Sequence, residues 1–327
     1  MSQASPAGEA GLAVGWAPAG PASPARAGPR AGLSLASWSR QLLVAMRPKQ
    51  WIKNLLVFAA PGTAGALGHG HVAAQATQAA LAFCAVSSGT YLLNDSFDRQ
   101  ADRLHPTKRH RPVASGAVSL AEARVAGVGL VGASVAASAV VGGPQLALVV
   151  AAYAALSFAY TVALKHLAPV DLLAVAGGFV LRAVAGGAAT HVPLSGWFLT
   201  VALFGSLYVV AAKRSAEQER LGDGGGAHRV TLASYTRAQL VGVRLGAAAV
   251  AMAGSFFWAF HKAAETGSAG VLVQVSLAPL ALAFARYEAL VRAGHGGAPE
   301  ELFLADRLLQ AAAVCWLALV AAATYSG

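Results

Sequence analysis

Residues 94–102 read NDSFDRQAD and directly follow an apolar run over residues 72–93. If the helix of that run continues, Asp95, Asp98 and Asp102 stand at positions i, i+3 and i+7 and share one face. Three carboxylates on one face repel each other unless cations lie among them. Carboxylate oxygens suit Mg²⁺, which takes further ligands from substrate phosphates. A solvated acidic helix end is the simpler alternative, but the chain has only 14 acidic residues. The candidate metal ligands are Asn94, Asp95, Asp98 and Asp102.

Basic stretches flank this motif on both sides. Residues 105–112 read HPTKRHRP, and residues 47–54 read RPKQWIKN. Lysine and arginine side chains beside a metal bind the outer oxygens of a diphosphate while the metal neutralises the inner ones. Lys49 and Lys53 are one helical turn apart and are expected to face the same way. Alternatively, both stretches only anchor the chain at the membrane interface. The substrate-binding candidates here are Lys49, Lys53, Lys108, Arg109 and Arg111.

Further candidates lie later in the chain. Arg182 follows Asp171 in an apolar run, which places it roughly 16 Å along a helix. An arginine at that depth in a membrane is costly and is a functional candidate, although an internal salt bridge would also explain it. The GDGGG stretch at 222–226 has no preceding strand and no Gly-Lys-Ser/Thr ending, so it predicts a flexible part of a lid and not a nucleotide loop. The remaining substrate-binding candidates are Asn94, Tyr160, Lys165, Arg182, Lys213 and Arg214.

Composition favours lipid as the solvent. Hydrophobic residues make up 56% of the 327 residues and charged residues 12%, about half the charged share of a soluble domain. Apolar runs long enough to cross a bilayer recur along the chain, and the GGPQ turn at 142–145 joins two of them into a tight hairpin. We therefore expect an all-α, polytopic membrane protein with about nine transmembrane helices. The predicted spans are 53–69, 72–93, 120–141, 146–163, 170–190, 195–212, 238–260, 269–291 and 303–325.

Positive charge sets the expected orientation. With the amino terminus inside, the inside segments and adjacent helix ends hold every Lys and Arg except Lys262 and Arg182, as the positive-inside rule requires. We therefore expect a multi-pass plasma-membrane protein whose amino terminus and active site are cytoplasmic. The net charge is +10, and the basic residues stand between apolar runs. This placement indicates phosphate or anionic lipid as the binding partner and no nucleic acid. Residues 1–36 predict a disordered tail, followed by one transmembrane domain over 37–327.

The N-D-x-x-D-x-x-x-D motif at 94–102, placed after a second predicted span, resembles the UbiA-type intramembrane prenyltransferase superfamily. With nine spans and two long inside loops, the resemblance covers nearly all of residues 40–327. It implies helices around a central cavity with cytoplasmic cap loops, and a prenyl diphosphate bound through two Asp-rich motifs. This chain departs at the second motif, where residues 213–217 read KRSAE instead of the usual Asp-x-x-x-Asp.

That departure, together with the stretches at 47–54, 105–112 and 181–195, is similar to one branch of the superfamily, the decaprenyl-phosphate phosphoribosyltransferases. The branch implies Mg²⁺-dependent transfer of 5-phosphoribosyl from phosphoribosyl diphosphate (PRPP) to a polyprenyl phosphate such as decaprenyl phosphate. Pyrophosphate leaves, and the product feeds cell-wall arabinan synthesis. We assign the catalytic role to Asp95, Asp98 and Lys53.

Two other functions remain open. An ordinary UbiA-type prenyltransferase would move a prenyl chain to an aromatic acceptor, but the missing second Asp-rich motif argues against it. A transporter of anionic solutes would need polar residues near the midplane of several broken helices, and Arg182 is the clear example. A homo-oligomer is compatible with the sequence.

Overall fold

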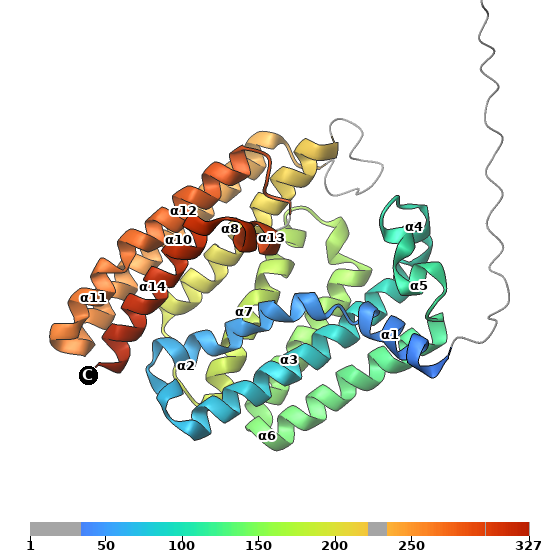
Figure 1. The fold of residues 1–327 in the computed structure, drawn as a ribbon, viewed down its shortest axis with the longest axis horizontal. Coiled ribbons are helices and arrows are strands. Elements are labelled where there is room, and N and C mark those ends of the chain that lie inside the picture. Colours follow the sequence, from blue (N-terminus) through green and yellow to red (C-terminus); the bar gives the residue numbers. More distant parts are fainter. Residues whose placement is uncertain (1–33, 222–233, 298, 327) are drawn as a thin grey trace, which may run out of the picture. The chain divides into compact units, whose positions relative to one another are not determined.

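The computed structural model describes residues 34–221, 234–297 and 299–326, and every regular element among them is a helix (Figure 1). The predicted tail lies outside these residues up to position 33, and so does the predicted lid stretch at 222–226. A first helix that the sequence did not suggest begins at Leu35.

The elements are α1 (Leu35–Ala45), η1 (Pro48–Phe58), α2 (Ala59–Thr63), η2 (Ala66–Gly68), α3 (Gly70–Phe97), α4 (Arg99–Leu104), η3 (Lys108–His110), α5 (Pro112–Ser115), α6 (Leu120–Val162), η4 (Leu164–His166), α7 (Val170–Thr190), α8 (Gly196–Leu221), α10 (Arg237–Thr266), η6 (Gly267–Ala269), α11 (Gly270–Val275), α12 (Leu277–Arg292), α13 (Pro299–Ala305) and α14 (Arg307–Tyr325).

Seven helices in the described ranges are long and apolar enough to cross a bilayer, with α11 and α12 counted as one. Helix α6 has 43 residues, about twice the number that one crossing needs. Its backbone leaves the helical conformation at Gly143, where φ is 73°, a value that glycine adopts without steric cost. Gly127 before this point and Thr161 after it both contact α3. Helix α6 is therefore a folded pair, with its turn at the predicted position 142–145.

The first predicted span, 53–69, has a different structure from the one expected. Residues 48–58 form the 3₁₀ helix η1, which has three residues per turn and extends about 22 Å at a rise of about 2.0 Å per residue. Exposure follows that period: positions 49, 52 and 55 are exposed, and positions 54, 57 and 60 are buried. A spacing of four residues turns such a helix by about one and a third turns. Lys49 and Lys53 therefore do not face the same way, and that expectation was wrong.

Helix α7 joins two packed halves of the described chain. Leu172 and Ala176 belong to a core shared with α8, α10, α12 and α14. Ala185 and Ala189, further along α7, belong to a core shared with η1, α3 and α6. Figure 1 shows α7 between the blue-to-green helices and the yellow-to-red ones. Side chains on α7 can therefore reach cavities in either half.

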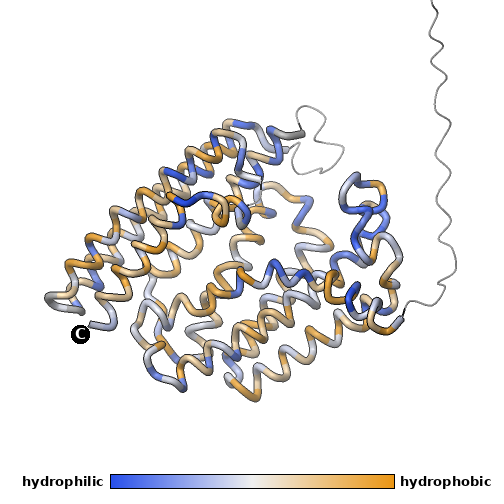
Figure 2. The backbone as a smooth tube through the Cα atoms, viewed as in Figure 1, coloured by the Kyte–Doolittle hydropathy of each residue, from blue (hydrophilic) through white to orange (hydrophobic). Residues whose placement is uncertain are grey.

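Polar and apolar residues separate along the helices. Figure 2 shows the long helices largely in orange, while blue stretches gather at α4, in the first part of η1 and near the end of α8. These stretches contain the basic and acidic residues that the sequence singled out. A membrane helix keeps such groups away from lipid unless they pair inside the protein. These polar stretches are therefore where the protein can bind a soluble substrate.

Gly186 of α7 faces the backbone of η1. A Cβ built on Gly186 would lie 1.9 Å from the carbonyl oxygen of Val57. We expect Gly186→Ala to push α7 away from η1 and to destabilise the protein by about 3 kcal/mol or more. Thermal unfolding in detergent measures the effect. The control is Gly129→Ala on α6, where a Cβ meets no atom within 4 Å; it should leave Tm unchanged or slightly higher. Equal Tm values for the two variants would contradict the contact.

Candidate functional site

The Asp-rich motif lies where α3 ends. The chain bends at Asp98, whose ψ is 3°, and α4 begins with the next residue. The helix therefore does not continue through the motif, contrary to the expectation from the i, i+3, i+7 spacing. Asp95 and Asp102 nevertheless converge, because Nη1 of Arg111 donates to Asp95 Oδ1 at 3.2 Å and to Asp102 Oδ2 at 2.7 Å. Arg47 also donates to Asp95.

Asp98 has a separate partner on the far side of the motif. Nζ of Lys165 lies 2.5 Å from Asp98 Oδ1, which links η4 to the bend after α3. Asp98 and Asp102 both lie within electrostatic range of the Asp95 carboxylate. Within the described ranges, no three carboxylate, histidine or cysteine side chains surround a common point as metal ligands. The three carboxylates are thus paired with three basic side chains.

A cavity of about 250 Å³ opens beside this motif, between η1, α3, the second arm of α6 and α7. We name it the polar cavity for the basic, amide and hydroxyl side chains among its lining residues. Its basic lining residues are Arg47, Lys53 and Arg182. The described lining includes no Asp or Glu side chain. A cavity with three cations and no acidic lining residue is suited to an anion with several charges. Five of the candidate residues therefore meet here. Lys53, Asn94, Tyr160 and Arg182 line the cavity, and Asp95 borders it through its contact with Arg47.

Arg182 lines this cavity and is 5% exposed. Its Nε donates to Asn54 Oδ1 at 2.8 Å, its Nη1 to the Gly178 carbonyl at 2.7 Å and its Nη2 to the Tyr153 hydroxyl at 2.9 Å. The guanidinium also lies over the Tyr153 ring, 4.7 Å from its centroid. None of the ion pairs between described residues includes Arg182. An internal salt bridge therefore does not explain its burial, and its charge is available to a bound anion.

Arg214 belongs to a different cluster at the end of α8. Its Nε donates to the fully buried Asp171 at 3.2 Å, and its other nitrogens donate to Glu217 at 2.8 Å and to the Tyr160 hydroxyl at 3.3 Å. Tyr235, beyond the end of α8, donates to the second oxygen of Asp171. Burial and this hydrogen bond raise the pKa of the Tyr235 hydroxyl, so it stays a donor at neutral pH. Arg214 thus positions Tyr160, which lines the cavity, and does not itself line it.

This pairing predicts a loss of stability when Arg214 is replaced. Arg214→Met leaves the Asp171 charge buried, and breaking a buried pair costs about 3–5 kcal/mol. The double variant Asp171→Asn/Arg214→Met should recover part of that loss. Denaturation of the purified variants in detergent measures both. Lys213→Met, at the half-buried neighbouring position, is the matched control and should keep the wild-type Tm. Wild-type stability of Arg214→Met would mean that the cluster is not structural.

Four other basic candidates lie outside the cavity. Lys49 and Arg109 are exposed, and Lys108 and Lys213 are half-buried without contributing to the cavity lining. Arg109 donates instead to the neighbouring His110 ring at 3.2 Å. The 3₁₀ geometry of η1 explains the difference between Lys49 and Lys53, because it turns Lys53 alone toward the cavity.

Three residues of this site were not predicted from the sequence. Arg47 and Asn54 lie in the quoted stretch 47–54, so their charge and polarity at the start of an apolar run were the available signal. Tyr153 lies within an apolar run, and its contact with Arg182 has no signature in the sequence.

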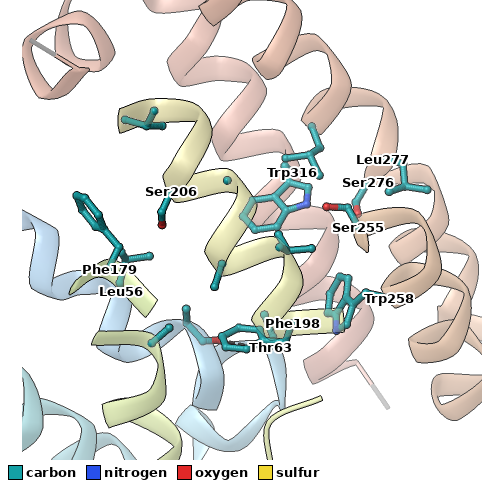
Figure 3. Close-up of a pocket in the computed structure, with 17 residues that line it drawn as sticks. Leu56, Thr63, Phe179, Phe198, Ser206, Ser255, Trp258, Ser276, Leu277 and Trp316 are labelled. Atoms are coloured by element: carbon teal, nitrogen blue, oxygen red, sulfur yellow. Dashed lines mark hydrogen bonds between the residues drawn. The ribbon is translucent and has the colours of Figure 1, made fainter. Parts of the chain in front are cut away.

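A second cavity, of about 370 Å³, lies on the other side of α7. It is bounded by η1, α2, α7, α8, α10, α12 and α14, and its described lining is apolar apart from hydroxyl groups and two Trp side chains. In Figure 3, Phe179 and Leu56 stand on one side of this space, and Trp316 and Leu277 on the other. Phe179 lines both cavities, so the polar and apolar spaces adjoin there.

Comparison with known proteins places this architecture. The family described as the UbiA prenyltransferase family matches residues 55–312. The chain belongs to this family. A relative from Mycobacterium tuberculosis, named decaprenyl-phosphate phosphoribosyltransferase, is 42% identical over 290 residues, covering 86% of this chain and 94% of the relative. A protein of the same name from Corynebacterium glutamicum is 40% identical over 290 residues, covering 87% and 86%.

Solved UbiA structures share the fold. A UbiA homologue from Archaeoglobus fulgidus bound to GPP and Mg²⁺ aligns with a TM-score of 0.64 at 14% identity, covering 88% of this chain and 100% of that one. The same homologue bound to Cd²⁺ aligns with a TM-score of 0.62, covering 87% and 99%. The prediction of a UbiA-type, all-α membrane protein is confirmed. The count of nine spans stays a prediction.

Proposed function

We propose that this UbiA-family chain transfers 5-phosphoribosyl from PRPP to a polyprenyl phosphate such as decaprenyl phosphate, with Mg²⁺, and releases pyrophosphate. The observation that carries the proposal is the polar cavity with Arg47, Lys53 and Arg182 beside the Asp-rich motif. PRPP brings a diphosphate and a 5-phosphate, and the acceptor brings another phosphate. Relatives about 40% identical carry the name of this activity, and the product would serve cell-wall arabinan synthesis.

The donor set fits a divalent metal in its chemistry. Asp95, Asp98 and Asp102 offer hard carboxylate oxygens, and Asn94 offers an amide oxygen, which are ligands that Mg²⁺ accepts. Arg111 already bridges two of these carboxylates with one nitrogen, so they lie close enough to share a cation. When bound, Mg²⁺ neutralises negative charge on the departing diphosphate.

The side chains of the cavity then position the reactants. Lys53, Arg47 and Arg182 hold phosphate oxygens around ribose C1, and the bond from C1 to the diphosphate breaks as the bond to the acceptor oxygen forms. A phosphate monoester has a second pKa of about 6, so the acceptor oxygen is already largely ionised at pH 7 and needs no base. Direct displacement inverts C1, giving a β-linked product from an α donor. Charge neutralisation and alignment are the contributions of the protein.

The apolar cavity supplies a place for part of the polyprenyl tail. It adjoins the polar cavity at Phe179, so an acceptor with its phosphate beside Lys53 can extend its first isoprene units past this ring. A tail in that position excludes water from the reacting phosphate, which suppresses hydrolysis of the donor. The rest of the chain would lie in the bilayer.

We further propose the orientation that the charges predict. The segments rich in Lys and Arg include the Asp-rich motif, η4 and the end of α8. By the positive-inside rule, the amino terminus and the site then face the cytoplasm of a plasma membrane. PRPP is a highly charged cytosolic compound and reaches the site from that side. Cysteine labelling of α4 in intact cells and in inverted vesicles checks this orientation.

The test is transfer by the purified protein. One mixture holds labelled PRPP, decaprenyl phosphate and Mg²⁺; a second holds a prenyl diphosphate and aromatic acceptors. We expect label in the lipid phase of the first mixture and no prenylated product in the second. Prenylated aromatic product without lipid-linked ribose phosphate would replace the proposal with ordinary prenyl transfer. Anion uptake into vesicles with no product in either mixture would indicate a transporter.

A further inference from the structure

Two arginines hold the place where a shared cation would lie in the Asp-rich motif. Asp95 is 2% exposed and Asp102 is 5% exposed, and Nη1 of Arg111 contacts an oxygen of each. Arg47 donates to the same Asp95 oxygen, Oδ1. The arginines themselves are 27% and 28% exposed. The two carboxylates are thus buried, whereas the arginine side chains that neutralise them lie nearer to solvent.

The charges of the motif already balance in the protein alone. Three carboxylates pair with three basic side chains, which are Arg47, Arg111 and Lys165. A divalent ion added to this set would leave two excess positive charges among half-buried groups, which is unfavourable. A metal that arrives together with a diphosphate reverses this, because the phosphate oxygens give the displaced guanidinium groups new partners.

Arg47 can exchange one anionic partner, the Asp95 carboxylate, for another, a diphosphate bound in the polar cavity. It lines the polar cavity and stacks over the Tyr91 ring at 4.9 Å. Its φ of 57° is in the left-handed region, at the residue before Pro48 where the chain enters η1. Its contact with Asp95 and its place in the cavity lining put the Arg47 side chain at the boundary between this carboxylate and the cavity.

We propose that Arg111 and Arg47 are exchangeable counter-ions: they neutralise Asp95 and Asp102 until metal and diphosphate bind together, and then transfer to the phosphate oxygens. This rests on the proposed diphosphate donor and adds how the site couples the two ligands. Metal and diphosphate each strengthen the binding of the other by the same factor, because such coupling is reciprocal.

The test measures Mn²⁺ binding by electron paramagnetic resonance on the purified protein, with no donor present. Arg111→Gln removes the cation that Asp95 and Asp102 share, so we expect Mn²⁺ alone to bind on the order of tenfold more tightly than in the wild type. Retention of labelled inorganic pyrophosphate in the presence of Mn²⁺ should fall by a similar factor. The matched control is Arg124→Gln, an exposed position on α6 with the same change of charge, and it should change neither value.

Opposite shifts in metal and pyrophosphate binding support the exchange, and a purely structural arginine would not tighten metal binding. Unchanged or weaker Mn²⁺ binding in Arg111→Gln overturns the proposal. Should Arg111→Gln not fold, Arg47→Gln serves as the second variant with the same expected signs. If PRPP proves not to be the donor, the Mn²⁺ shift is still measurable, so the two proposals fail separately.

Discussion

Asp95→Asn is expected to lower kcat/KM for transfer by about 10³-fold or more, because the amide is a poor Mg²⁺ ligand and the metal supplies several kcal/mol to the departing diphosphate. Asp98→Asn should behave similarly. Asp102→Asn should cost less, since Asp102 lies beyond the bend at Asp98 and would act on the metal through water. Initial rates across a Mg²⁺ series, with purified variants in detergent, measure these effects.

The structure predicts that these variants still fold. Arg47 and Arg111 are about a quarter exposed, so water can solvate them after Asp95 loses its charge. The control is Glu265→Gln. Glu265 is an exposed carboxylate that pairs with Lys262 near the end of α10, outside the candidate site. It should keep wild-type rates. Near-normal rates for both Asp95→Asn and Asp98→Asn at low Mg²⁺ would remove the metal from this motif.

Arg182→Lys is expected to lower kcat/KM by about 10²-fold or more, because one ammonium group cannot hold Asn54, the Gly178 carbonyl and Tyr153 and also present a forked pair of donors to phosphate. Arg182→Met should lose stability as well, since it leaves the Asn54 side-chain oxygen and the Tyr153 hydroxyl without this donor, at about 1–3 kcal/mol for each unsatisfied group. Steady-state kinetics with varied donor and a thermal melt separate the two effects.

Arg244→Lys provides the matched control for a buried arginine. Arg244 is 5% exposed and donates to Glu288 at 3.0 Å in the half of the chain away from the polar cavity. Its replacement should lower Tm without changing KM for the donor. If Arg182→Lys has wild-type kinetics, its guanidinium is structural and the anion is held by Lys53 and Arg47 instead.

The sequence predicted the long elements well because their signal is local. Apolar length and the turn at 142–145 were enough to place α3, α6 and α7, and the deep position of Arg182 was enough to mark it. The bend at Asp98 was not predictable from side-chain spacing, because a helix that continues and a helix that breaks have the same pattern over seven residues. Arg111, 13 residues beyond Asp98, supplies the convergence that helical periodicity was expected to give.

The remaining differences come from tertiary contacts. Arg214 was expected at a phosphate because KRSAE replaces an acidic motif, but its partner Asp171 lies 43 positions earlier in the chain. Tyr235 completes that cluster from beyond α8. Pairings over such separations follow from how α7 and α8 pack, and no local pattern contains them.

The period of three in η1 has a consequence for the evolution of this segment. An α-helix tolerates the insertion of whole heptads, because seven residues return close to the same face. In η1 the register instead returns after every third residue. Relatives that gain or lose three residues before Lys53 can keep it aimed into the cavity, while a change of one or two residues would move Ile52 or Asn54 to its place. Alignments across this stretch should therefore be read in triplets.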